Sequence, residues 1–128
     1  MKPRVLVADD EVAITDLVAF TLDDAGYEVI SAFDGPQALE LAREKRPDLV
    51  MLDIMMPGVD GREVSRRLKA DPATSDIPIL LFSAASNLNL KEAHADGFLA
   101  KPFDLDYLVR LVGEMIRRKP VRREAESH

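Results

Sequence analysis

The stretch VLVADDE, residues 5–11, decides the fold of this chain. Small and aliphatic residues lead directly into three carboxylates, Asp9, Asp10 and Glu11. A short apolar run of this kind is typical of a strand that is buried on both faces, as in a parallel sheet. Clustered carboxylates repel one another, so the arrangement raises the question of what holds three acids at the end of a buried strand.

Further apolar runs follow along the chain, and amphipathic segments alternate with them. The expected strands lie at residues 4–9, 27–32, 47–53, 76–84 and 97–101. The expected helices lie at residues 11–26, 37–46, 62–71, 88–94 and 104–119. Strict alternation of strands and helices predicts an α/β fold with a parallel sheet covered by helices on both faces. Asp34 is expected to cap the second helix, with Pro36 in its first turn.

Length and composition narrow the class of protein. The chain has 128 residues, enough for one domain with its own core, and a net charge of -6, which argues against a nucleic-acid-binding surface. It contains no cysteine, which excludes disulfides, thiolate metal sites and a cysteine nucleophile. The first apolar run is too short for a signal peptide, and no run approaches the ~20 residues of a membrane span. We therefore expect a cytoplasmic protein that binds neither nucleic acid nor membranes.

The expected domain covers residues 1–119. The C-terminal stretch of the chain, RRKPVRREAESH at residues 117–128, is locally basic. Cations near a helix C-terminus interact favourably with the helix dipole, so the simpler interpretation of residues 120–128 is a disordered or helical solvated tail. The alternative is the remnant of a linker to a lost output domain.

Reactive polar residues follow four of the five expected strands. Ligands of an open parallel sheet bind at the carboxyl ends of its strands. Taken singly, each residue has a simpler role, such as a helix cap or a solvated lysine, but together they gather acids, a hydroxyl and an ammonium at one edge. A divalent cation such as Mg²⁺ would relieve the repulsion between the acids. The residues are Asp9, Asp10 and Glu11 after the first strand, Asp53 after the third, Ser83 after the fourth and Lys101 after the fifth.

These motifs, each at a strand end and in this order, resemble the receiver domain of bacterial two-component response regulators across residues 3–118. The resemblance implies a doubly wound, flavodoxin-like or CheY-like fold with five parallel strands in the order 2-1-3-4-5. It is carried by Asp9-Asp10, by DIMMPGVDG at residues 53–61, by Ser83 and by Lys101-Pro102-Phe103.

The resemblance implies that Asp53 is the phosphoacceptor, which takes a phosphoryl group from a sensor histidine kinase or a phosphotransfer protein. The implied cofactor is Mg²⁺ or Mn²⁺. Its direct ligands are implied to be Asp10, Asp53 and the backbone carbonyl of Met55, while Asp9 acts mainly through metal-bound water. The domain is a signalling module under this interpretation, with only self-phosphorylation and autodephosphorylation as activities.

The remaining site residues are also implied by the resemblance. Lys101 pairs with Asp53 in the empty site and with a phosphoryl oxygen afterwards, and the Ser83 hydroxyl donates to another phosphoryl oxygen. The Lys101-Pro102 peptide bond is predicted to be cis. Ser83 and Phe98 form the implied switch. Phe98 lacks a tyrosine hydroxyl, so only a packing switch is available, and a plain core role is an equal alternative.

The implied docking surface for the kinase combines the first helix with the loop after the fifth strand. It consists of Glu11, Ala13, Ile14, Leu17, Pro102 and Phe103. Ile14 and Leu17 also fit the buried stripe of the helix, whereas Phe20 lies off that stripe and is a candidate partner contact.

Further expected partners are a downstream output protein or a lost output domain, and a weak homodimer whose mode is left open. Ser83 lies 18 residues before Lys101, about one helical turn fewer than is usual in the family. The fourth helix, between Asn87 and Gly97, is therefore expected to be shortened.

Two alternatives belong to other classes of protein. One is a small Mg²⁺-dependent phosphatase or phosphotransferase with an aspartate nucleophile, which would need a cap that this chain has no spare residues to form. The other is a flavodoxin-like cofactor binder, whose phosphate loop should be rich in Gly, Ser and Thr rather than acids. No G-x-x-x-x-G-K-[ST] or G-x-G-x-x-G motif occurs, so the sequence does not support a nucleotide site.

Overall fold

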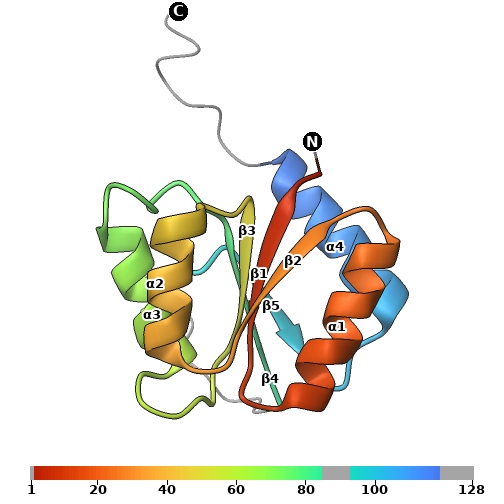
Figure 1. The fold of residues 1–128 in the computed structure, drawn as a ribbon, viewed down its shortest axis with the longest axis horizontal. Coiled ribbons are helices and arrows are strands. Elements are labelled where there is room, and N and C mark those ends of the chain that lie inside the picture. Colours follow the sequence, from red (N-terminus) through yellow and green to blue (C-terminus); the bar gives the residue numbers. More distant parts are fainter. Residues whose placement is uncertain (1, 85–92, 119–128) are drawn as a thin grey trace, which may run out of the picture.

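The computed structural model describes residues 2–84 and 93–118. Five parallel strands form one sheet in the order β2-β1-β3-β4-β5. Helices α2 and α3 cover one face of this sheet, and α1 and α4 cover the other (Figure 1). The predicted doubly wound α/β fold and its strand order are confirmed.

All five predicted strands are present, each shorter than predicted. They are β1 (Arg4–Ala8), β2 (Glu28–Ala32), β3 (Leu49–Asp53), β4 (Ile79–Ser83) and β5 (Gly97–Ala100). The helices are α1 (Val12–Asp24), α2 (Gly35–Lys45), α3 (Gly61–Ala70) and α4 (Leu105–Arg117). The predicted helix at residues 88–94, and with it the prediction of a shortened fourth helix, lies largely outside the described residues. The tail predicted for residues 120–128 lies outside them entirely, and the domain boundary at residue 119 stays a prediction.

Side chains of the central strands alternate between two cores. In β4, Leu81 packs into the core beneath α2 and α3, whereas Leu80 and Phe82 pack into the core beneath α1 and α4. Successive side chains of a strand point to opposite faces, so both faces of these strands are apolar and buried. This double burial explains why the strands read as continuous apolar runs in the sequence.

Aspartates begin three of the four helices in the described part of the chain. The carboxylate of Asp34 accepts a hydrogen bond of 2.8 Å from the backbone N–H of Gln37, which confirms the predicted cap of α2. Asp60 and Asp104 cap α3 and α4 in the same way. The first helix ends before Gly26, whose φ of 101° is in the left-handed region that favours glycine. These caps set where each helix starts relative to the strand ends.

Within residues 2–84 and 93–118, none of the helices has the length and apolar character needed to cross a bilayer.

Candidate functional site

Acidic and basic side chains converge at the carboxyl edge of the sheet, as the strand-end pattern predicted. Carboxylate oxygens of Asp9, Asp10 and Asp53 lie within 4.8 Å of one another. The ammonium of Lys101 lies 3.0 Å from Asp9 Oδ2 and 3.6 Å from Asp53 Oδ2. Segments from three different strands therefore contribute to a single cluster.

Backbone hydrogen bonds hold these residues in place beyond the ends of their strands. The backbone N–H of Asp9 donates to the carbonyl of Ala32 on β2 at 3.1 Å. The N–H of Lys101 donates to the carbonyl of Ser83 on β4 at 2.9 Å. The positions of the site residues are therefore set by the sheet itself, and the Lys101-Pro102 peptide bond that follows is cis, as predicted.

Asp9 is completely buried and has partners on both carboxylate oxygens. Its Oδ1 accepts from the backbone N–H of Glu11 at 2.9 Å, and its Oδ2 accepts from Lys101. The buried hydroxyl of Thr15 donates to the Asp9 carbonyl oxygen at 3.2 Å. The N-cap residue of α1 is Glu11. The alternative that Asp9 or Asp10 serves only as the cap of this helix is therefore wrong. Thr15 was not among the predicted site residues, although a hydroxyl within the apolar stripe of the first helix is a signal for such a buried hydrogen bond.

Asp53 is only 4% exposed, and its surroundings disfavour the ionised form. Burial, followed by the negative charge of Asp9, raises the pKa of Asp53 from 3.8 to about 6. The positive charge of Lys101 and a hydrogen bond of 3.4 Å from the backbone N–H of Met55 oppose this rise without cancelling it. Lys101 alone therefore does not offset the cost of ionising Asp53 at this buried position.

Lys101 contacts three carboxylates and an aromatic ring. Its ammonium lies closer to Asp9 than to Asp53, and it also lies 3.4 Å from Glu11. Burial lowers the pKa of Lys101, but the hydrogen bond with Asp9 and the charges of both buried aspartates outweigh this effect and raise the pKa overall. The ammonium also lies 5.0 Å from the ring centroid of Phe82, a contact that the sequence analysis did not identify.

Gly61 brings the start of α3 against the backbone of Asp53. A Cβ atom at Gly61 would lie 2.4 Å from the Asp53 carbonyl oxygen and 2.9 Å from Cα of Ile54. The Gly61 N–H donates to the Ile54 carbonyl at 2.9 Å. Only glycine leaves room for this approach, so the helix start fixes the backbone that carries the buried acid. In the sequence, Gly61 stood out only as the last residue of the DIMMPGVDG motif.

The residues predicted for partner binding on α1 differ in exposure. Glu11, Ala13 and Leu17 are exposed, whereas Ile14 is half-buried and packs against the core beneath α1 and α4. Phe20 is 73% exposed, so the prediction that it lies off the buried stripe is confirmed. In and just before α1, the accessible residues among those predicted to contact partners are therefore Glu11, Ala13, Leu17 and Phe20.

The two residues implied as a switch lie on the same face of the sheet. Phe98 pairs in register with Leu81, and both pack against the core beneath α2 and α3. Ser83 is two residues beyond Leu81 on β4, so its side chain is on that face as well. In the loop after β5, Pro102 is exposed, and half-buried Phe103 packs against the opposite core.

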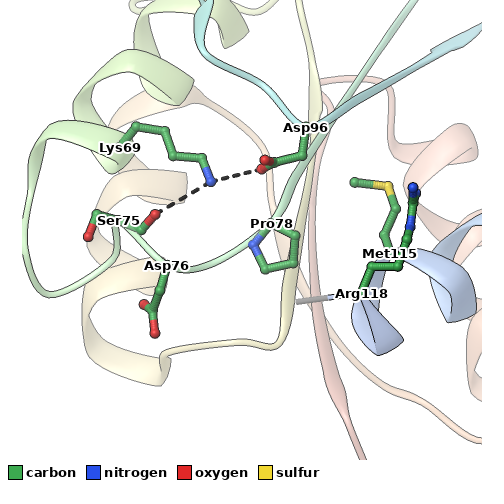
Figure 2. A pocket seen from close by; sticks show the side chains of 7 residues that line it. All are labelled: Lys69, Ser75, Asp76, Pro78, Asp96, Met115 and Arg118. Carbon is green, nitrogen blue, oxygen red and sulfur yellow. Dashed lines mark hydrogen bonds and ion pairs between the residues drawn. The ribbon is translucent and has the colours of Figure 1, made fainter. Parts of the chain in front are cut away.

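A cavity of about 390 Å³ lies at the opposite edge of the sheet, lined by Lys69, Ser75, Asp76, Pro78, Asp96, Met115 and Arg118 (Figure 2). The Lys69 ammonium lies 2.8 Å from Asp96 Oδ2 and 3.5 Å from the Ser75 carbonyl oxygen. Asp96 Oδ2 also accepts from the backbone N–H of Ile79 at 2.8 Å. The lysine and aspartate of this cavity therefore hold α3 to the starts of β4 and β5, away from the Asp53 site.

A parallel sheet in the order 2-1-3-4-5, with an acidic cluster and a lysine at its carboxyl edge, defines a flavodoxin-like α/β domain. The model of the response regulator receiver domain family matches residues 5–113. The chain therefore belongs to the response regulator receiver domain family of two-component systems.

Individual relatives agree with this assignment. The chain is 42% identical over 130 residues to the DNA-binding dual master transcriptional regulator RpaA of Synechocystis sp., covering 98% of this chain and 54% of that protein. The chain thus spans about half the length of RpaA and of other curated relatives that it matches.

Two solved structures show the same fold. The chemotaxis response regulator CheY4 of Vibrio cholerae superposes with a TM-score of 0.83 at 32% identity, covering 90% of this chain and 99% of that one. The receiver domain of sensor histidine kinase PA1611 from Pseudomonas aeruginosa PAO1, with a magnesium ion coordinated in its active-site cleft, superposes with a TM-score of 0.86 at 26% identity. That comparison covers 91% of this chain and 99% of the other.

Proposed function

We propose that Asp53 accepts a phosphoryl group from a sensor histidine kinase or a phosphotransfer protein in an Mg²⁺-dependent reaction, and that this modification switches partner binding. The observation that carries the proposal is the clustering of buried Asp53 with Asp9, Asp10 and Lys101 at the carboxyl edge of the sheet. A buried carboxylate flanked by further acids and one lysine has the groups that phosphoryl transfer needs, which are a nucleophile and means of balancing charge.

The donor set fits magnesium. All three clustered side chains offer carboxylate oxygens, the ligands that Mg²⁺ prefers, and exposed Asp10 leaves room for the several waters that Mg²⁺ retains. We assign Asp10, Asp53 and the backbone carbonyl of Met55 as direct ligands and Asp9 as a ligand through water. Bound Mg²⁺ or Mn²⁺ would supply positive charge that offsets the negative charge of these carboxylates and of an incoming phosphoryl group. The magnesium ion in the active-site cleft of the related PA1611 receiver domain supports a magnesium site in this chain.

The transfer step requires only one nucleophile from this chain. A carboxylate oxygen of Asp53 attacks phosphorus and forms a C–O–P bond, while the bond between phosphorus and the donor histidine nitrogen breaks and its electron pair returns to that nitrogen. Lys101, whose ammonium lies 3.6 Å from Asp53 Oδ2, then pairs with one phosphoryl oxygen. The hydroxyl of Ser83 donates to another. In the proposed autodephosphorylation, water attacks the same phosphorus, the bond between phosphorus and the Asp53 oxygen breaks, and inorganic phosphate and the free Asp53 carboxylate are released.

Signal output begins at Ser83 and Phe98 in this proposal. Both lie on the face of the sheet beneath α2 and α3, so a shift of Ser83 toward the phosphoryl group changes the packing available to half-buried Phe98. A kinase is proposed to bind the exposed residues of α1 and the loop after β5, which includes Pro102 and Phe103. A downstream output protein or output domain is proposed to respond to the changed packing of Phe98. Cytoplasmic location and a weak homodimer stay predictions.

Mass spectrometry of the intact protein tests the proposal. The protein is incubated with Mg²⁺ and a small acyl or amido phosphate donor, and we expect a gain of one phosphoryl group that is lost on chelation and in Asp53→Asn. Asp16→Asn, which removes an exposed carboxylate on α1, is the matched control and should still be labelled. Phosphate release from varied monoesters without labelled protein would instead favour a phosphatase, and a flavin absorbing after purification would favour a cofactor binder.

A further inference from the structure

The ammonium of Lys101 lies over the ring of Phe82, at 5.0 Å from the ring centroid. Phe82 is completely buried in the core beneath α1 and α4, so its ring has little freedom to move away. Phe103, two residues after Lys101, packs edge-on against the same ring at 6.1 Å with an interplanar angle of 86°. The ring is therefore held from below by the core and from one side by the loop that carries the lysine.

The ring also stands beside the phosphoacceptor. Phe82 is the partner of Asp53 in the register between β3 and β4, so both residues lie at the same level of the sheet. The side chain of Lys101 is only 15% exposed, and a cation–π contact strengthens when water is excluded from the cation. The contact between the Lys101 ammonium and the Phe82 ring is thus strong enough to influence the position of the ammonium.

We propose that Phe82 is a positioning residue for phosphoryl transfer, whose ring keeps the Lys101 ammonium beside Asp53 independently of the surrounding carboxylates. The inference rests on the function proposed above and deepens it. Three carboxylates attract Lys101, namely Asp9, Glu11 and Asp53, and at least two of them lose effective negative charge when a divalent cation binds. The attraction of the ring for the cation does not depend on those charges. The ring therefore keeps the lysine in place in the state in which a phosphoryl oxygen arrives.

A structural readout tests the contact without any phosphorylation. An aromatic ring shifts the NMR signals of protons above its face upfield, so we expect the ε-methylene protons of Lys101 to be shifted upfield in the wild-type protein, with and without Mg²⁺. Phe82→Leu should abolish this shift, and Phe82→Tyr should retain it. Leu80→Val is the matched control, because Leu80 is equally buried on the same face of β4, and it should leave the shift unchanged. An unshifted Lys101 signal in the wild-type protein with Mg²⁺ would overturn the inference.

A double-mutant cycle on the rate of labelling tests whether Phe82 acts through Lys101. With saturating Mg²⁺ and a small phosphate donor, the rate of labelling should fall ~2- to 10-fold in Phe82→Leu, which is the size of a partly desolvated cation–π contact, and should stay unchanged in Leu80→Val. In a Lys101→Met background, Phe82→Leu should cause no additional loss. An equal loss in both backgrounds would show that the ring acts only through packing and would overturn the inference, while labelling of Asp53 would still support the proposed function.

A second series keeps the inference falsifiable if Phe82→Leu does not fold. Fluorinated phenylalanines introduced at position 82 retain the ring shape while weakening its attraction for a cation. The labelling rate should decrease stepwise with each added fluorine, and a flat series would overturn the inference. A wild-type protein that is not labelled at all would overturn the proposed function itself, whatever the NMR shift of Lys101.

Discussion

Replacing Asp53 with asparagine should stabilise the metal-free protein at neutral pH. Burial and the charge of Asp9 raise the pKa of Asp53 to about 6, compared with 3.8 for an unperturbed aspartate. The folded state therefore binds this proton more tightly than the unfolded chain. The resulting stability is fully present below the unfolded pKa of 3.8 and is lost as the pH rises through about 6. Above that pH the folded protein carries an unfavourable buried charge that asparagine lacks.

The size of the effect follows from the pKa. A difference of about two pKa units corresponds to about 3 kcal/mol, which is an upper value because water reaches the edge of the site beside exposed Asp10. We expect Asp53→Asn to raise the free energy of unfolding by about 1–3 kcal/mol at a pH of about 7.5 without divalent cations. The same substitution removes a proposed magnesium ligand, so added Mg²⁺ should stabilise the wild-type protein more than the variant.

Urea unfolding in the presence of a chelator measures this difference. The advantage of Asp53→Asn over the wild type should shrink between about pH 7.5 and about pH 4, because the wild-type side chain becomes neutral over that range. Asp16→Asn, on the exposed side of α1, is the control and should change the free energy of unfolding by less than about 0.5 kcal/mol. Equal stability of wild type and Asp53→Asn at neutral pH, or an advantage that does not vary with pH, would refute the electrostatic reasoning.

Three further substitutions test the scaffold of the site. Gly61→Ala should lower the free energy of unfolding by about 1–3 kcal/mol and slow labelling, because its Cβ would lie 2.4 Å from the Asp53 carbonyl; unchanged urea unfolding would contradict this close approach. Asp34→Ala should lower the free energy of unfolding by about 1 kcal/mol, because α2 loses the hydrogen bond from the Gln37 N–H to its N-cap side chain. Asp34→Asn should retain most of the stability in the same urea measurement. Thr15→Val should lower it by about 1 kcal/mol because the buried hydroxyl bonds the backbone at the end of β1, and Thr15→Ser should recover part of that loss in thermal unfolding.

Much of the fold was predictable because local patterns encode it. Strands buried on both faces must be continuously apolar. The apolar runs around Val7, Met51 and Leu81 therefore predicted strands without any knowledge of which strands pair with them. Helix caps are equally local, since Asp34 bonds a residue only three positions away. The clustering of acids at one edge was also predictable, because parallel strands present their carboxyl ends on the same side.

The contacts within the site were less predictable because they join segments distant in sequence. Lys101 was expected to pair with Asp53, yet its nearest carboxylate is that of Asp9, 92 residues away along the chain. The ring beneath its ammonium belongs to Phe82, which reads as an ordinary core residue in the sequence. The space that excludes a side chain at Gly61 likewise depends on where α3 meets β3.

The amino-acid sequence by itself determined the alternation of strands and helices, the edge at which the polar groups gather and the kinds of chemical group found there. These follow from hydrophobic periodicity and strand direction, which act over a few residues at a time. Only the tertiary structure decided which carboxylates are buried, which carboxylate lies closest to the ammonium of Lys101 and which ring lies beneath that ammonium. Burial, pKa and contact distances arise from packing between strands and helices that are far apart in the chain, so they exist only once the sheet has assembled.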